Sequence, residues 1–223
     1  MSSVSQRTLH RYAQAGLWAL PVYGIVNLIG TVTAQPDYKT DFPAYARYVS
    51  TTPFLVSHLA ASMLGTGIGL LGFAALFIYL ASGRRAGVAL AAFVTTMLGN
   101  IAIVALFGVA AFAQPAIGKA FLAGHRDAVA LNSSVYGTPL NATAAAGLGL
   151  FFAGAILYAI AISGSDSLPR PAGILFATAV PIFAIGSLLG NVMAPIGALL
   201  EMGSAIWIAL SASRAAPALD RQP

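Results

Sequence analysis

The chain contains no cysteine and very little charge. Its 223 residues include 6 acidic and 11 basic side chains, so 8% are charged and 58% are hydrophobic. The lack of cysteine excludes disulfides, thiol catalysis and thiolate metal sites. So few charges cannot cover the surface of a soluble globule, and we therefore expect the chain to lie in a lipid bilayer.

Long polar linkers are also missing, so the sequence predicts one transmembrane domain, 1–223, with short tails at about 1–15 and 214–223. The formal net charge of +5 would suggest an anionic partner in a soluble protein. In a membrane protein, basic residues mainly indicate orientation and contact with lipid head groups. The expected partner is therefore membrane lipid and not nucleic acid.

Six apolar segments are long enough to be transmembrane helices, since a helix needs about 20 apolar residues to cross the hydrocarbon. They are 16–34, 54–82, 86–113, 140–163, 172–189 and 196–213. The last two are separated at Gly190-Asn191 and Pro195, because a single helix over both would be roughly 60 Å long, about twice the hydrocarbon thickness. The sequence predicts an all-α, six-helix membrane bundle.

The distribution of basic residues predicts that both termini lie on the cytoplasmic side. This orientation places seven basic residues inside and four outside: Arg7, Arg11, Arg84, Arg85, Arg170, Arg214 and Arg221 against Lys39, Arg47, Lys119 and Arg126. An alternative is that the first segment is a signal peptide cleaved after Val32-Thr33-Ala34, a small-residue pattern. The remaining topology is the same in both cases.

Two pairs of segments have similar sequences. GLLGFAALFIYLASG at 69–83 resembles GLFFAGAILYAIAISG at 149–164, and each copy continues through Ala-Gly to Leu-Gly-Asn, at 98–100 and 189–191. Spans 2 and 3 would then repeat as spans 4 and 5 in the same orientation, as in transporters with parallel repeats. Chance similarity among small and aliphatic residues is the alternative.

Glu201 is the leading functional candidate because it lies in a predicted span with no other charge between Arg170 and Arg214. An ionisable group in hydrocarbon costs roughly 3 kcal/mol on insertion scales and usually faces a partner, the bundle interior or a water-filled cavity. The alternative is a protonated or paired carboxyl that links helices. His58, in the outer turns of the second span, could partner Glu201.

The other polar residues also lie in the outer halves of the spans or near mid-membrane. They are Asn27, Asn100, Gln114, Tyr136, Asn141 and Asn191. Unpaired polar groups are costly in lipid, so this asymmetry predicts an outward-facing, partly hydrated cavity lined by these residues. Two outer loops, 35–53 and 115–139, could cover it with short helices: an aromatic one in the first loop, and 116–123 and 126–131 in the second.

The sequence favours binding of a small apolar or amphipathic molecule in this cavity, with Glu201 and His58 as polar contacts. One alternative is a membrane enzyme, an isomerase, cyclase or hydrolase, with Glu201 as general acid and His58 as base or orienting group. Others are a proton-coupled transporter and an accessory subunit, or oligomer, whose polar residues meet another chain. The 3 histidines are too scattered for a metal site, and no cofactor is expected.

Two segments resemble parts of a known group of proteins. They are GVAAFAQPAIG at 108–118 and the loop from Ser163-Gly164 through LPRPAG at 168–173. Both look like segments of small, uncharacterised bacterial multi-pass membrane proteins, particularly of actinobacterial type. The resemblance implies a helical membrane fold in the bacterial inner (cell) membrane, and it implies no activity, cofactor or catalytic residue.

Overall fold

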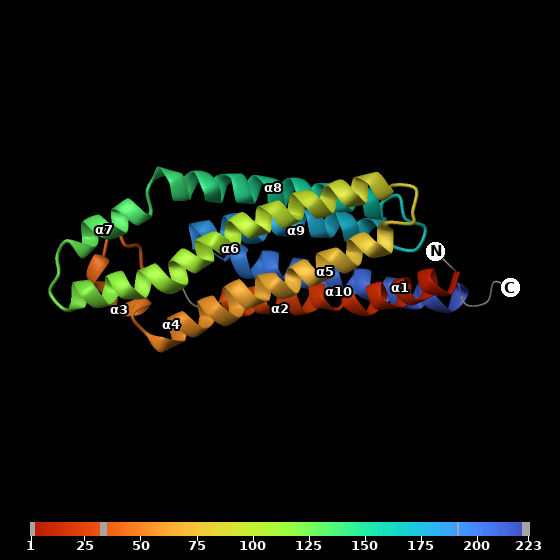
Figure 1. The fold of residues 1–223 in the computed structure, drawn as a ribbon. Helices are drawn as coiled ribbons and strands as arrows, with labels where there is room; N and C mark the ends of the chain where they lie inside the picture. Colours follow the sequence, from red (N-terminus) through yellow and green to blue (C-terminus); the bar gives the residue numbers. More distant parts are fainter. Residues whose placement is uncertain (1–2, 32–34, 191, 220–223) are drawn as a thin grey trace.

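The computed structural model describes residues 3–31, 35–190 and 192–219, and it forms a bundle of α-helices without strands over those residues (Figure 1). Within these described ranges, six helices are long and apolar enough to cross a membrane, which confirms the all-α, six-span prediction. Asn191 and the candidate cleavage pattern Val32-Thr33-Ala34 lie outside the described residues.

The first span consists of two helices, α1 (Ser3–Gly16) and α2 (Ala19–Gly30). The break falls at Leu17 and Trp18, just before Pro21 in the first turn of α2. Proline has no backbone N–H to donate to the carbonyl four residues earlier, and its ring fits most easily in the first turn of a helix. Pro21 therefore accounts for the end of α1 and the new start at Ala19.

The second span runs without interruption through α4 (Thr52–Val56), the π-helix η1 (Ser57–Leu64) and α5 (Gly65–Leu80). The remaining spans are α6 (Ala86–Leu122), α8 (Thr138–Ile162), α9 (Arg170–Leu189) and α10 (Met193–Leu219). Both ends of the chain lie at one end of the bundle, here called the terminal end. The opposite, distal end carries the short helices α3 (Phe42–Val49) and α7 (Ala128–Val135).

The predicted turn between the last two spans is confirmed. Helix α9 ends at Leu189, and Gly190 adopts a left-handed conformation with φ of 59°. Glycine is the usual residue there because it has no Cβ to clash with the backbone. Helices α9 and α10 then pack closely, since a Cβ at Gly197 would lie 2.2 Å from the Phe183 nitrogen.

The loop helices agree only in part with the predictions. Helix α3 confirms the short aromatic helix expected in the loop 35–53. The prediction of a separate helix at 116–123 is wrong. Helix α6 continues through Pro115 as one helix of 37 residues, about 55 Å long. In place of the helix predicted at 126–131, α7 begins at Ala128 and extends to Val135.

The bundle has two hydrophobic cores. The larger one fills the terminal half and includes Leu20, Phe73, Tyr158, Phe176 and Ile208, none more than 2% exposed. The smaller one joins α3 to the distal part of α6 and to α7 through Phe42, Tyr45, Val49, Ile117 and Ala128. The distal end is therefore a packed cap and not a set of loose loops.

The glycines of the two Leu-Gly-Asn copies in the suggested repeat have different structural roles. Gly99 lies within α6, where a Cβ would come within 2.8 Å of the Gly147 carbonyl of α8. Gly190 is instead the left-handed residue of the α9–α10 turn. Both pairs, α5–α6 and α8–α9, form hairpins that turn at the terminal end, but this part of the sequence similarity does not extend to equivalent packing.

Candidate functional site

Glu201 is paired with Asn27 inside the bundle. Its side chain is 1% exposed, and Oε2 accepts a hydrogen bond of 3.0 Å from Asn27 Nδ2. The pairing depends on close approach of α2 and α10, since a Cβ at Gly24 would lie 2.7 Å from the Cα of Met202. One turn beyond Gly24, Asn27 then faces Glu201. Tyr23 of α2 also lies close to both side chains.

The second carboxyl oxygen of Glu201 has no hydrogen-bond partner among the residues that the structure describes. Oε1 is buried and makes no hydrogen bond to any of the described residues. A buried, unpaired carboxyl oxygen is costly, and a carboxylate costs more than a carboxylic acid. The site thus offers a hydrogen-bonding position that the described chain does not fill.

His58 lies at the beginning of η1 and makes its contacts within its own helix. Its Nδ1 is 3.0 Å from the Phe54 carbonyl oxygen, and its ring packs on Phe54 with centroids 4.0 Å apart. A carbonyl oxygen can only accept, so this contact requires a proton on Nδ1. The neutral ring then presents Nε2 as a hydrogen-bond acceptor.

The structure does not bring His58 and Glu201 into contact. Glu201 bonds to Asn27, and His58 bonds to Phe54, with Ser57 Oγ 3.4 Å from the ring. Among the described residues, no hydrogen bond joins the expected pair. Both residues lie in the distal half of the bundle, but the direction in which each helix faces does not follow from position along the chain.

A cavity of about 1000 Å³ opens at the distal end between the end of α2, the start of the second span and the α9–α10 turn. Its wall combines apolar residues with hydroxyl groups, one histidine, one amide (Gln35) and one acidic residue (Asp37). The lining includes Ile29, Thr31, Tyr38, Tyr48, Val56, Ser57, His58, Ala61, Ser62, Ser187, Leu188, Leu189 and Ala194. Of the residues predicted to line an outward-facing cavity, His58 is part of this wall, whereas Glu201 and Asn27 are not.

The Glu201–Asn27 pair lies beneath this cavity. Asn27 is two residues before Ile29 in α2, and Glu201 is seven residues after Ala194 in α10, roughly 10 Å along the helix. Side chains of a helix lean toward its N-terminus, and α10 begins at the cavity. The carboxyl group therefore leans in the direction of the cavity floor.

Two hydrogen bonds between side chains link the helices of the distal cap. Gln114 of α6 donates through Nε2 to the Tyr136 hydroxyl, and the Tyr45 hydroxyl of α3 donates to Asn132 Oδ1 of α7 over 3.0 Å. Tyr45 and Asn132 are both 0% exposed. Burial, with the neighbouring Tyr136 and Tyr38, raises the pKa of Tyr45, so its hydroxyl stays protonated and able to donate.

Two of the other predicted asparagines, Asn100 and Asn141, do not line the cavity. Asn100 is buried in α6 and donates to the Thr96 carbonyl of its own helix. Asn141 is exposed near the start of α8 and donates to the Tyr136 carbonyl. Asn191 follows Gly190 but lies outside the described residues. Asn100 and Asn141 therefore have local structural roles here.

Several residues of the cavity and cap were not predicted from the sequence. Thr31, Ser57, Ser62 and Ser187 line the cavity, and Asn132 is the buried partner of Tyr45. Serine and threonine are common in membrane helices because they bond to their own backbone, so their presence gives no signal. The usable signal in this wall was His58, a histidine within a predicted span.

No three histidine, aspartate or glutamate side chains lie close enough to hold a metal ion in the part of the chain that the structure describes. Comparison of the chain with protein families, with curated protein sequences and with solved structures found no match.

Proposed function

We propose that the protein binds a small amphipathic molecule in the distal cavity, and that this cavity faces the outside of the cell. The observation that carries the proposal is the coincidence of the cavity with the π-helix η1. Ser57, His58, Ala60, Ala61 and Ser62 line the cavity, and η1 has no buried residue. π-helical turns within α-helices are rare and often occur at functional sites.

The wall suits a ligand with an apolar body and a hydrogen-bond donor. Ile29, Val56 and Leu188 supply apolar surface, while His58 supplies an acceptor nitrogen and Ser62 a hydroxyl. A volume of about 1000 Å³ is at the upper end of the range usual for small-molecule sites. A hydroxylated or amide-bearing lipid-like molecule meets these requirements.

Glu201 contributes to this proposal from below the cavity floor. Glu201, whose Oε1 has no described partner, is seven residues after Ala194 in α10, and Ala194 lines the cavity. A polar tail of the ligand, or a water beneath it, would complete the hydrogen bonding of the carboxyl group. The enzyme alternative, with Glu201 as acid and His58 as base, has less support because the two groups bond to different partners.

The test is native mass spectrometry of the protein purified in mild detergent. We expect wild type to retain a stoichiometric small molecule other than bulk lipid. Ala61→Trp, which fills the cavity, and His58→Phe, which keeps the ring but removes the acceptor, should each lower the retained amount. Ala116→Trp, on an exposed part of α6 outside the cavity, is the matched control and should retain it fully.

Two results would contradict the proposal. Equal retention in wild type and Ala61→Trp would place the molecule elsewhere. Absence of any specific molecule in wild type, together with a second membrane protein at fixed stoichiometry, would favour the accessory-subunit alternative. Glu201→Gln separates the roles of the carboxyl group: loss of the ligand with an intact fold indicates contact, and an unchanged amount indicates a helix-linking role.

A further inference from the structure

A second concave surface lies at the terminal end of the bundle, between α8 and α9. It has a volume of about 400 Å³ and is lined by Arg85, Arg170, Ser163, Thr178 and isoleucines of both helices. The lining contains two arginines and no acidic residue. The groove lies at the opposite end from the distal cavity and is independent of the function proposed for it.

The arginines are at one end of the groove and the apolar residues follow along the helices. Arg170 is the first residue of α9, and Ile174 and Thr178 follow it at intervals of four, on one face. Ile156 and Ile160 form the matching row near the end of α8. The eight residue steps from Arg170 to Thr178 span roughly 12 Å of helix.

Arg85 is held in place by α8 and by the loop that follows it. One guanidinium nitrogen donates to the Ile160 carbonyl over 2.6 Å, and a Cβ at Gly164 would lie 2.4 Å from Arg85 Cδ. The bond satisfies a carbonyl in the last two turns of α8, which explains part of the role of Arg85. A guanidinium has five N–H donors, so most of its donors remain for a ligand.

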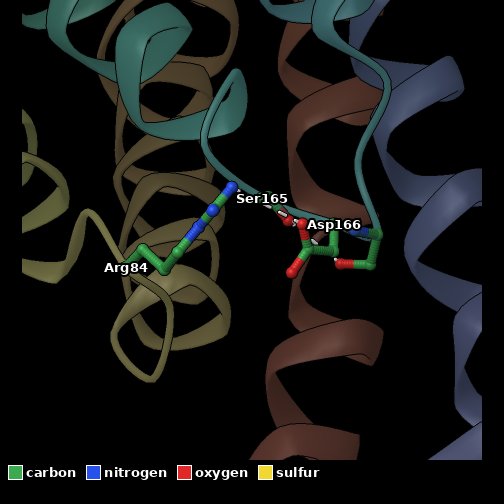
Figure 2. A network of polar contacts seen from close by, with 4 residues as sticks. Arg84, Ser165 and Asp166 are labelled. Atoms are coloured by element: carbon green, nitrogen blue, oxygen red, sulfur yellow. Dashed lines mark hydrogen bonds and ion pairs between the residues drawn. The ribbon is translucent and has the colours of Figure 1, made fainter.

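The neighbouring charges do not neutralise the groove. Asp166 in the α8–α9 loop pairs with Arg84, with 3.7 Å between Nη2 and Oδ1 (Figure 2). Neither of those two residues is in the lining. Arg170 makes no ion pair or hydrogen bond with any residue that the structure describes. The two lining arginines therefore form a local site of positive charge where two spans meet the membrane surface.

We propose that this groove binds one anionic phospholipid, with Arg85 and Arg170 at its phosphate and Ile156, Ile160 and Ile174 along an acyl chain. Ile156 is 53% exposed and Ile174 is 47% exposed, so the apolar part of the groove is open to lipid. Basic pockets between membrane helices bind anionic head groups, and guanidinium groups match phosphate geometry. A free phosphate ion would leave the isoleucine rows unused, which is why a phospholipid is the better occupant.

The experiment measures phosphatidylglycerol and phosphatidylcholine binding to the detergent-purified protein by native mass spectrometry. We expect wild type to prefer phosphatidylglycerol, and Arg170→Gln to weaken that binding about fivefold, the effect of one arginine near an anionic lipid surface. Ile174→Trp, which fills the groove and keeps both arginines, should also weaken it. Arg85→Gln is a secondary variant because Arg85 also caps α8.

Arg214→Gln is the matched control, since it removes one exposed arginine at the same end of the bundle and outside the groove. The proposal is overturned if this control weakens binding as much as Arg170→Gln, because general surface charge would then explain the preference. It is also overturned if inorganic phosphate displaces the lipid and Ile174→Trp has no effect, because the site would then bind an anion alone.

Discussion

The interior of the bundle is filled differently at its terminal and distal ends. At the terminal end, the interior is filled with aromatic rings: Phe73 and Tyr158 stack with centroids 5.7 Å apart, and the Tyr158 hydroxyl donates to the Phe73 carbonyl. Arg84 and Asp166, which pair at that end, are on the surface. At the distal end, polar side chains lie inside the protein and a cavity of about 1000 Å³ remains open.

The difference shows which end of the bundle has unfilled space. A close-packed interior has no room for a ligand, because protein cores leave few voids larger than a water molecule. The π-helix η1 has no buried residue, whereas α5, its continuation, has nine. The backbone irregularity thus coincides with the loss of packing, and both lie at the same end as the buried Glu201–Asn27 and Tyr45–Asn132 pairs.

The largest expected effect is loss of the aromatic core. Phe73 is 1% exposed and contacts the rings of Tyr158, Phe151 and Phe176. Phe73→Ala should lower the free energy of unfolding by about 3–5 kcal/mol, the usual range for a buried phenylalanine. The check is detergent-induced unfolding, with Phe112→Ala as control because Phe112 is 63% exposed. Equal losses in the two variants would contradict the described core.

A smaller effect is expected for the pair beneath the cavity. Asn27→Leu removes the hydrogen bond to Glu201, so that neither carboxyl oxygen has its described partner. The free energy of unfolding should therefore fall by about 1–2 kcal/mol. Glu201→Gln keeps an oxygen that can accept from Asn27 and should cost less. A double-mutant cycle measured by unfolding isolates the pair. A coupling energy near zero would show that the bond does not link α2 to α10.

The distal cap should depend on one buried hydrogen bond. Tyr45→Phe removes the hydroxyl that donates to Asn132 and should cost about 1 kcal/mol. The expected loss is local, so amide hydrogen exchange should increase in α3 and α7 and stay unchanged in α8 and α9. Tyr12→Phe is the control, since Tyr12 is 72% exposed. Exchange that increases equally throughout the bundle would contradict a separate distal core.

The smallest effect is expected at the surface of the terminal end. Arg84 and Asp166 are 79% and 94% exposed, and exposed ion pairs contribute little to stability because water and salt screen them. Arg84→Gln should leave the unfolding curve unchanged within the error of the measurement. A large loss of stability would mean that the loop between α8 and α9 holds the terminal end together.

Much of the architecture follows from local sequence. Length and hydropathy predict six spans, and Gly190 with Pro195 predicts the turn between α9 and α10. The continuation of α6 through Pro115 was not predictable in this way, because packing of α6 against α3, α7 and α8 outweighs the local cost of a proline.

The candidate site was predicted only in part, because it depends on how each helix is rotated. The positions of Glu201 and His58 along the chain indicate how far along their helices they lie. Asn27 pairs with Glu201 because Gly24 allows α2 to pack closely on α10 at Met202. The pairing of Tyr45 with Asn132 joins residues 87 positions apart. No local pattern in the sequence specifies either contact.

The most direct test of the open distal end uses the absence of cysteine from the chain. Single cysteines at Ser62, in the cavity wall, and at Ala74, twelve residues deeper in the same span, are treated in membranes with a membrane-impermeant maleimide. Thr40→Cys, in an exposed distal loop, is the positive control. We expect Ser62→Cys to react, Ala74→Cys not to react, and Ala61→Trp to slow the reaction at Ser62. A Ser62→Cys variant as unreactive as Ala74→Cys, with Thr40→Cys labelled normally, would contradict the cavity.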